Sequence, residues 1–568
     1  MRELASRGLL TLAAIAIGFA AADTYVVVMA LPEMMTAAGL TVGDLQRAAP
    51  IVSGFLLGYV AVLPLIGRVS DLRGRVPVLL GCLVVFAVGS IVTAAGYDLA
   101  TIVAGRLVQG IGAGGLIPPT LALISDTWPP ERRGLPLGVV GAVQELGSVV
   151  GPLWGAAVLA FGTWRDIFWL NAAVGLVIGA ALLRHRPAGA AERRRDWIGL
   201  GLLAAGGACL LLVMLSPRSL TTGVTSGLAF LPVAGESRWL APVALVGFGL
   251  LVAFGAWQVI APTPLLDWRG WGDVARQTDL WGAAALTVAL GAVIVAFAGA
   301  EPETAALSSD ALVLLPIAAV ALGLFVWRGR RAAHPLIPRG ALRATPAWGA
   351  IVLSFLVGSA LIAALVDVPF FARLTVAVDD QLAAALVLVR FLVALPLGAV
   401  LGGWLLRLVP PAPLTAAGMA LAGACFVVMS RWDAGALESP GATITLAACG
   451  LGFGLAIAPV NAALLEHTTA DVHGLASALL VVARMVGMLV GISALTTLGL
   501  RAYHAAAARI PAVDELCPDG AACTAYTLAL RDAGISQLQA VFAGAAVASF
   551  LAAALAPPLL RRRATLSP

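Results

Sequence analysis

Residues Gly67 to Arg75 read GRVSDLRGR and stand between two long apolar runs. The two glycines of this stretch, Gly67 and Gly74, permit a tight turn because glycine has no Cβ atom. One acidic residue, Asp71, lies among three arginines. The arginines are Arg68, Arg73 and Arg75. These opposite charges can form a latch that makes and breaks between two conformations, so we predict a gate on the cytoplasmic side of a membrane. The alternative is a basic loop that only sets the orientation of its flanking helices.

The composition around this loop is that of a chain buried in lipid. Of the 568 residues, 60% are hydrophobic and 11% are charged, whereas soluble domains carry roughly 25% charged residues. Apolar runs near the ~20 residues that cross a bilayer as a helix recur from end to end. Backbone polar groups in lipid must pair internally, and these runs lack the alternation of a barrel strand. We therefore predict an all-α polytopic membrane protein.

Twelve of the apolar runs fall into two groups of six that flank a long middle segment. The first group occupies 8–31, 49–67, 76–95, 98–122, 134–158 and 166–184. The second group occupies 347–370, 382–406, 413–431, 441–465, 475–500 and 538–560. We predict a six-helix bundle in 1–184, a linker region in 185–346 and a second six-helix bundle in 347–568.

The middle segment holds four further apolar runs and repeats itself. The runs are 197–216, 239–261, 280–300 and 311–328. One hairpin opens with DWIG at 196–199 and the next with DLWG at 279–282; they exit through PLL at 264–266 and PLI at 335–337. A duplicated two-helix insert explains this pattern and gives sixteen spans. Fourteen spans is the alternative, with one pair that does not cross the membrane.

The placement of charge predicts the orientation. All 35 basic residues are arginines, and their clusters alternate with weakly charged or acidic connections such as 301–310. The clusters lie at 68–75, 132–133, 184–195, 328–343 and 561–563. By the positive-inside rule the clusters and both termini are cytoplasmic, in the plasma (inner) membrane of a bacterium. The first run has a small-residue site at 20–22 but stays apolar beyond it, so we predict an uncleaved helix. This placement favours a membrane topology and does not suggest a nucleic-acid surface.

In the first group, three charged residues stand well inside predicted spans, where a charge is costly unless it has a partner or faces a wet cavity. Asp23 lies late in the first span, Arg106 opens RLVQGIGAGGLIPP in the fourth, and Glu145 lies in the fifth. A carboxyl in such a place is a candidate proton site. We predict that these residues couple proton transfer to helix movement. Structural ion pairs without transport are the alternative.

The sequence leaves open which arginine pairs with which acid. Arg484, in VVARMVGMLVG of the fifteenth span, and Arg390 are both candidate partners of Asp23. Asp367 in LVDVPFF echoes Asp23 in ADTYVVV, because each lies late in the first helix of its group. Arg484 therefore joins the predicted coupling residues, and Asp367 and Arg390 are secondary candidates.

The fifth span, GVVGAVQELGSVVGPLWG, carries glycines at every fourth position. Gly147, Gly151 and Gly155 form a smooth stripe against which another helix can pack closely, and Pro152 adds a local kink. Glu145 is about 200° around an ideal helix from Gly147 and so points away from that stripe. We therefore expect its carboxyl to face a cavity, with a hydrogen-bonded structural role as the alternative.

Two of the six cysteines are candidates for a disulfide. Cys517 and Cys523 lie in CPDGAAC, in the external segment before the last span, where an oxidising compartment and a Pro-Asp-Gly turn favour a bridge. Two free thiols are the alternative. The other four cysteines fall within predicted spans, where we expect inert packing residues. These are Cys82, Cys209, Cys425 and Cys449.

Several of these segments resemble the major facilitator superfamily. GRVSDLRGR is similar to its signature loop, RLVQGIGAGGLIPP to its helix-four motif, and GVVGAVQELGSVVGPLWG to the motif of its antiporters. WRDIFWLN, ADTYVVVMALP and VHGLASALLVVAR resemble the drug:proton antiporter branch that normally has fourteen helices. The resemblance covers both six-helix groups, about two thirds of the chain. It implies the major facilitator fold, a role of Arg106 in proton coupling, and export.

Within that branch the chain resembles the mycobacterial exporters of triacylglycerol that work with a periplasmic lipoprotein. The particular matches are QELGS and VVARM, beside ADTYVVV, LVDVPFF and RFLVALPLGAVLGGW. This implies Asp23, Glu145 and Arg484 as coupling residues, a large apolar lipid as cargo and a lipoprotein as partner. The middle segment departs from the resemblance, because those exporters have a two-helix linker and four linker helices are expected here.

Two other functions compete with proton-driven lipid export. Multidrug efflux of apolar or cationic drugs uses the same scaffold and the same coupling residues. A membrane-embedded enzyme is the remote alternative, since all five histidines fall at helix ends or in loops and suggest neither a catalytic nor a metal constellation. The histidines are His185, His334, His467, His473 and His504. The sequence lacks a Walker loop, so we expect a proton gradient, and no cofactor, to supply the energy.

Overall fold

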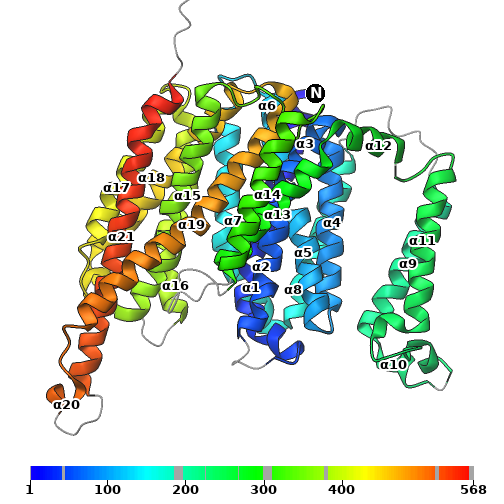
Figure 1. Cartoon of the computed structure of the whole chain (residues 1–568), viewed down its shortest axis with the longest axis horizontal. Helices are drawn as coiled ribbons and strands as arrows, with labels where there is room; N and C mark the ends of the chain where they lie inside the picture. Colours follow the sequence, from blue (N-terminus) through cyan, green and yellow to red (C-terminus); the bar gives the residue numbers. More distant parts are fainter. Residues whose placement is uncertain are drawn as a thin grey trace, which may run out of the picture.

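The computed structural model describes residues 2–40, 45–184, 196–223, 225–266, 268–298, 310–376, 381–517 and 523–561. The regular secondary structure of these residues is entirely helical. The long helices run side by side between two ends of the molecule, and the first and last helices both reach the upper end in Figure 1. The predicted all-α class is confirmed.

Two groups of helices surround the middle segment. The first group is α1 (Arg2–Ala37), α2 (Leu45–Ala61), α3 (Leu63–Arg73), α4 (Arg75–Ala95), α5 (Leu99–Gly115), α6 (Ile117–Thr127), α7 (Gly134–Phe161) and α8 (Trp164–Leu183). The last group is α15 (Thr345–Thr375), α16 (Gln381–Leu405), α17 (Pro411–Met429), α18 (Pro440–Glu466), α19 (His473–Ala507), the short α20 (Val513–Leu516) and α21 (Thr524–Leu560). Short 3-10 helices occupy Gly227–Phe230, Arg238–Leu240, Ala436–Glu438 and Ala470–Val472.

Helix length and composition support a multi-pass membrane protein. Within the part of the chain described above, 13 helices are long and apolar enough to cross a membrane, or up to 14 if one bent pair is a single span. That pair is Pro50–Ala61 with Leu63–Arg73, bent by 41°. These 13 helices do not include the 36-residue α1 or the 28-residue α7. The predicted total of sixteen spans, with fourteen as its alternative, stays a prediction.

The last two long helices extend well past their predicted ends. The apolar run 538–560 predicts a start fourteen residues later than the observed α21, which begins at Thr524. Residues Arg531 and Asp532 end the apolar run but do not break the helix, because both tolerate helical backbone. Figure 1 shows the end of α19 and the start of α21 projecting beyond the bundle at the lower left, with α20 at the tip.

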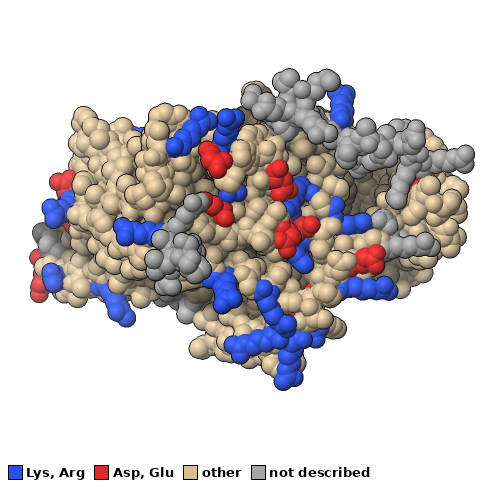
Figure 2. Space-filling view, turned by 90° about the horizontal axis from the view of Figure 1, so that it is seen from above, with Lys and Arg blue, Asp and Glu red and all other residues tan. Residues whose placement is uncertain are grey.

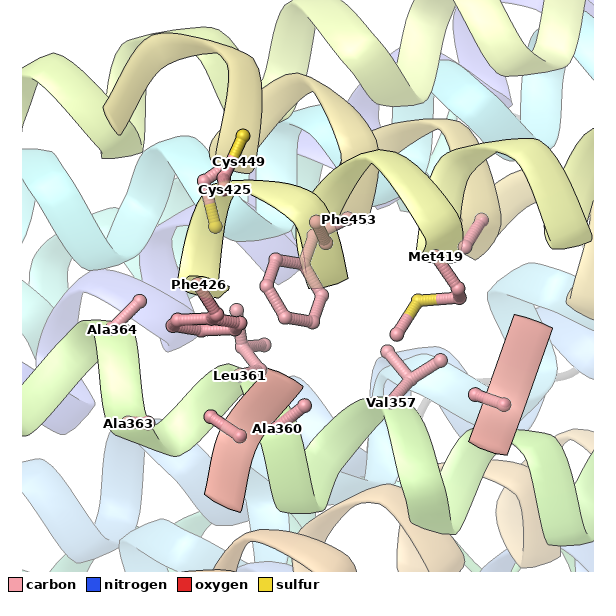
Figure 3. Close-up of a cluster of buried hydrophobic side chains, with 14 of the residues drawn as sticks. Val357, Ala360, Leu361, Ala363, Ala364, Met419, Cys425, Phe426, Cys449 and Phe453 are labelled. Carbon is pink, nitrogen blue, oxygen red and sulfur yellow. The ribbon is translucent and has the colours of Figure 1, made fainter. Parts of the chain in front are cut away.

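The core of the last helix group consists of aromatic rings packed among small side chains. Phe426 of α17 stacks on Phe542 of α21 with ring centroids 6.3 Å apart, and it meets Phe453 of α18 edge-on at 6.0 Å. Figure 3 shows Phe426 and Phe453 beside Leu361 of α15, with Cys425 and Cys449 next to each other. Both cysteines are buried and free, as expected of packing residues.

The middle segment forms two hairpins with different surroundings. Its helices are α9 (Trp197–Leu215), α10 (Arg218–Thr221), α11 (Pro242–Ile260), α12 (Trp268–Gln277), α13 (Leu280–Ala298) and α14 (Ala311–Arg331). The α13–α14 hairpin packs on both α2 and α19, whereas α9 and α11 pack on each other and touch the bundle mainly at α4. In Figure 1 the α9–α11 hairpin stands apart at the right of the bundle. The tip of that hairpin makes its contact through the Arg238 guanidinium, 4.4 Å over the Tyr97 ring.

The two hairpins open in the same way. Asp196 accepts a hydrogen bond from the Gly199 N–H at 2.8 Å, and Asp279 accepts one from the Gly282 N–H at 3.0 Å. Each carboxylate is also held by the second helix of its hairpin, through Gln258 at 2.7 Å in the first and Arg328 at 3.0 Å in the second. Desolvation raises the pKa of Asp196, but its hydrogen bonds outweigh that effect and hold the pKa below its ordinary value. The similar carboxylate geometry accords with a duplicated insert.

Candidate functional site

A buried ion pair lies at the centre of the first helix group. Asp23 of α1 accepts a hydrogen bond from Arg106 of α5, Nη1 to Oδ2, at 2.7 Å, and both side chains are 0% exposed. The amide of Asn171, on α8, donates to the other carboxylate oxygen of Asp23. Arg106 Nη1 also donates to Gln109 Oε1 at 2.7 Å. Gln109 Nε2 in turn donates to Ser90 Oγ of α4 at 3.0 Å, so five side chains from four helices form one polar network in an apolar bundle.

Aromatic rings and one backbone carbonyl complete the surroundings of Arg106. Its guanidinium lies 4.2 Å from the ring centroid of Phe55 and 5.6 Å from that of Phe168, a geometry that attracts a cation to the ring face. Its Nε donates to the Ile51 carbonyl at 3.3 Å. Arg106 Nη2 is buried and has no hydrogen-bond partner among the described residues. The arginine is thus held in place, with one donor left unused.

The arginine beside Asp23 is Arg106, so the expectation that Arg484 or Arg390 fills this place is wrong. Arg390 instead donates to Thr443 Oγ1 at 2.9 Å, within the last helix group. Asp367, on α15, forms no hydrogen bond or ion pair with any residue that the structure describes. These two secondary candidates therefore join neither Asp23 nor Glu145. Asn171 and Gln109 were not predicted, although each is a polar residue inside an apolar helix.

A second ion pair joins the two helix groups. Arg484 of α19 lies 3.5 Å from Glu145 of α7, Nη1 to Oε1, and the two side chains are 10% and 13% exposed. Arg484 lines a small cavity of about 30 Å³, whose lining residues come from α6, α7, α15, α18 and α19. Its wall is mostly apolar and includes two amides, Gln144 and Asn461. Glu145 itself is not among the residues that line this cavity, so its cavity-facing position stays a prediction.

The glycine stripe of α7 packs against α1. A Cβ atom on Gly147 would lie 2.3 Å from the Gly18 carbonyl oxygen, and one on Gly151 would lie 2.3 Å from the Ala22 carbonyl oxygen. Gly155 is buried, and the side chain of Pro152 lies outside the described ones. The stripe thus places α7 in backbone contact with α1 beside Asp23, while Glu145 reaches the other helix group.

The predicted loop Gly67–Arg75 is helical through Arg73 as the second half of α3, so only Gly74 forms a turn and the expected turn at Gly67 is wrong. The segment binds the start of α19. Asp71 accepts hydrogen bonds from the backbone N–H groups of Gly474 at 2.8 Å and Leu475 at 3.0 Å, which are unpaired donors at a helix N-terminus. A carboxylate at this position also interacts favourably with the helix dipole. Gly67 makes the contact possible, since a Cβ there would lie 2.6 Å from the Gly474 carbonyl oxygen. The loop thus joins the two helix groups at one end of the molecule.

The three arginines of this segment make different contacts. Arg75 contacts Asp71 and also donates to Asp126 at 3.0 Å and to the Ala470 carbonyl at 3.0 Å. Arg68 donates to the Asp471 carbonyl at 3.3 Å. Arg73 instead stacks on Trp271 of α12 at 5.2 Å. Gly74 separates α3 from α4 with a φ of +91°, a conformation that favours glycine. The acceptor network is therefore wider than the predicted latch.

The external pair of cysteines is bonded. Cys517 and Cys523 form a disulfide with Cα atoms 5.7 Å apart, between α20 and α21. The described residues contain no group of three or more His, Cys, Asp or Glu side chains that could hold a metal ion.

The comparisons with known proteins agree with this architecture. A family model described as the Major Facilitator Superfamily matches residues 13–327, and the chain belongs to this superfamily of membrane transporters. It is 34% identical over 512 residues to a triacylglyceride transporter of Mycolicibacterium hassiacum, covering 88% of this chain and 80% of that protein. It is 32% identical over 507 residues to a triacylglyceride transporter of Mycobacterium tuberculosis, covering 86% and 82%. The solved proton:xylose symporter XylE shares the fold, with a TM-score of 0.54 and 14% identity over 99% of this chain and 97% of that one.

Proposed function

We propose that this transporter is a proton-coupled exporter of hydrophobic molecules, with lipids such as triacylglycerols as its cargo. The observation that carries the proposal is the ion pair between Glu145 and Arg484, because it links α7 to α19 at the wall of the cavity between the helix groups. A charge pair at that place can hold the groups together only while Glu145 is ionised. Protonation of Glu145 therefore releases Arg484 and loosens one side of the interface.

The Asp23–Arg106 pair supplies the second proton site of the proposal. It lies wholly within the first helix group. There Asn171 donates to the Asp23 carboxylate, and Gln109 accepts from the Arg106 guanidinium. A proton on Asp23 cancels the carboxylate that Arg106 and Asn171 hold. Because the Asp23 segment of α1 contacts the glycine stripe of α7, a shift of α1 is transmitted to the helix that carries Glu145. The two sites are thus coupled through backbone contact.

The loop Gly67–Arg75 closes one end in this conformation, and we assign that end to the cytoplasm. Asp71 and Arg75 tie α3 to the start of α19, so cargo cannot pass between the groups there without breaking these bonds. Alternating access then requires this latch to open while the cavity exchanges its proton. The start of α1 and the end of α21 lie at this same end, where the positive-inside rule would place cytoplasmic arginine clusters.

The cargo assignment rests on the cavity and on the relatives. The cavity wall is rich in Leu, Val, Ala and Ile and offers few hydrogen-bond donors, which suits an apolar molecule with scattered ester oxygens. The curated relatives at 32–34% identity are named triacylglyceride transporters. A periplasmic lipoprotein, which only the resemblance noted in the sequence implies, is the proposed acceptor of the exported lipid.

The test is transport by the purified protein in proteoliposomes with an imposed pH gradient. We expect a fluorescent triacylglycerol to move only when the gradient is present, and to stop when a protonophore collapses it. Movement of a cationic dye under the gradient, without movement of the lipid, would assign the protein to multidrug efflux. Lipid movement that is equal with and without the gradient would contradict proton coupling.

A further inference from the structure

A basic pocket lies beside the gate loop, apart from the transport cavity. It is lined by Arg68 of α3 and by the segment that follows α14, and its volume is about 230 Å³, somewhat below the ~300–1,000 Å³ of sites for drug-sized ligands. The lining residues are Arg68, Ala333, His334, Pro335, Pro338 and Arg339. None of them is acidic. The pocket therefore offers two permanent positive charges and an imidazole to whatever occupies it.

The two arginines of the pocket lack carboxylate partners among the described residues. Arg68 donates only to the Asp471 carbonyl, at 3.3 Å, and its Nε is buried without an acceptor in the part of the chain that the structure describes. Arg339 uses one nitrogen, Nη2, for the carbonyls of Arg330 at 2.7 Å and Ala332 at 3.1 Å. A buried N–H without an acceptor is costly. An anion with several oxygens would satisfy the donors that remain.

Two tryptophans and an amphipathic helix indicate the level of the pocket relative to the membrane surface. Trp327, in the last turn of α14, is 48% exposed, with the Arg331 guanidinium 4.8 Å over its ring. Trp271 of α12 is 43% exposed and stacks with Arg73. Figure 1 shows α12 lying across the end of the bundle, as an interfacial helix does. Tryptophan gathers at the level of the lipid headgroups, so the pocket opens where phospholipid phosphates lie.

We propose that this pocket binds the phosphate of an anionic membrane phospholipid. Figure 2, which views the molecule from this end, shows basic side chains gathered at its surface, and pockets of this kind between membrane helices bind anionic headgroups. Arg68 connects the pocket to the gate, because it also holds the carbonyl of Asp471 just before α19. A lipid phosphate on Arg68 therefore stabilises the conformation in which α3 and α19 are joined. This site is separate from the cargo cavity, and its existence does not depend on the cargo.

The experiment measures lipid retained by the full-length protein. Purified protein is mixed with phosphatidylglycerol or phosphatidylcholine micelles, and bound lipid is counted by native mass spectrometry together with the thermal midpoint. We expect wild type to retain phosphatidylglycerol in preference to phosphatidylcholine. Arg339→Gln is expected to weaken this binding about fivefold, since a basic residue near the surface contributes ~1 kcal/mol to anionic-lipid binding. Arg343→Gln is the matched control, because Arg343 is exposed at the same end but does not line the pocket.

Three results would overturn the proposal. Equal retention of the two lipids by wild type would show no selective site. An equal loss in Arg339→Gln and Arg343→Gln would reduce the effect to general surface charge. Stabilisation of wild type by inorganic phosphate as strong as that by phosphatidylglycerol would assign the pocket to a free anion instead of a membrane lipid. A thermal midpoint of Arg339→Gln equal to that of wild type in phosphatidylcholine verifies that the variant is folded.

Discussion

At the scale of single residues, the sequence identifies the charged groups of the site but not their partners. Asp23, Arg106 and Glu145 stand out because an ionised side chain inside an apolar helix is costly without a reason. Their pairing depends on which helices pack together, and the sequence between Asp23 and Arg106, which are 83 positions apart, carries no signal of that. Asn171 was missed because a neutral amide in an apolar helix is common, and only its contact with Asp23 gives it a role.

Replacement of Glu145 tests the ion pair that joins the two helix groups. Glu145→Gln keeps the shape of the side chain and removes its charge, so Arg484 loses its carboxylate partner. We expect the variant to insert and fold, and gradient-driven lipid transport to fall at least about tenfold, since a loss of ~1.4 kcal/mol already produces that factor. Transport is measured in proteoliposomes at matched protein content.

The matched control for that variant is Glu438→Gln. Glu438 is an exposed carboxylate in a short 3-10 helix between α17 and α18, so its neutralisation should leave transport unchanged. Transport by Glu145→Gln at the wild-type rate would show that the Glu145–Arg484 pair takes no part in coupling.

At the scale of elements, the contact between α3 and α19 decides whether one end of the molecule is closed. The sequence predicts a gate at Gly67–Arg75 from glycines and alternating charge, but the partner of that gate is a helix N-terminus some 400 residues away in the chain. Backbone N–H groups carry no sequence signature, so this half of the latch could not be foreseen. Gly67 and Gly474 lie against each other because neither has a Cβ to separate the two backbones.

A methyl group on Gly67 should open this contact. Gly67→Ala places a Cβ 2.6 Å from a backbone oxygen that cannot rotate away, and overpacking of this kind typically costs about 1–3 kcal/mol. We expect a lower thermal midpoint and slower lipid transport than in wild type. Gly81→Ala is the control, since a Cβ on Gly81 has open space around it within 4 Å. Equal midpoints for the two variants would mean that α3 and α19 do not pack as described.

At the scale of the whole molecule, hydrophobic runs alone place most of the long helices, because a helix in lipid must be apolar over its full length. They fail where a helix leaves the membrane, as at the start of α21, since polar residues continue a helix in water. They also cannot distinguish a hairpin packed into the bundle, as α13–α14 is, from one beside it, as α9–α11 is. Each of these four helices contains an apolar stretch long enough to cross a membrane, and lateral packing leaves little trace in such a pattern.

The positions of the α9–α11 and α12 connections test the number of spans. Figure 1 places α10 at the end opposite α12, so single cysteines at Thr222 and Gly272 should face opposite sides of the membrane. In intact cells we expect an impermeant maleimide to label the cysteine of Thr222→Cys and to reach that of Gly272→Cys only after permeabilisation. Labelling of both from the same side would contradict a crossing by α11.

The central claim is that a buried carboxylate couples the proton gradient to lipid movement, and Asp23→Asn tests it most directly. Wild type and variant are reconstituted into proteoliposomes, and movement of a fluorescent triacylglycerol is followed with and without an imposed pH gradient. The asparagine retains the size of the side chain. Its amide oxygen can accept from Arg106, and its N–H can donate to Asn171 once that amide turns its oxygen inward, so we expect a folded protein. The account predicts gradient-dependent lipid movement in wild type and its loss in the variant. Gradient-dependent movement at the wild-type rate in Asp23→Asn would contradict it.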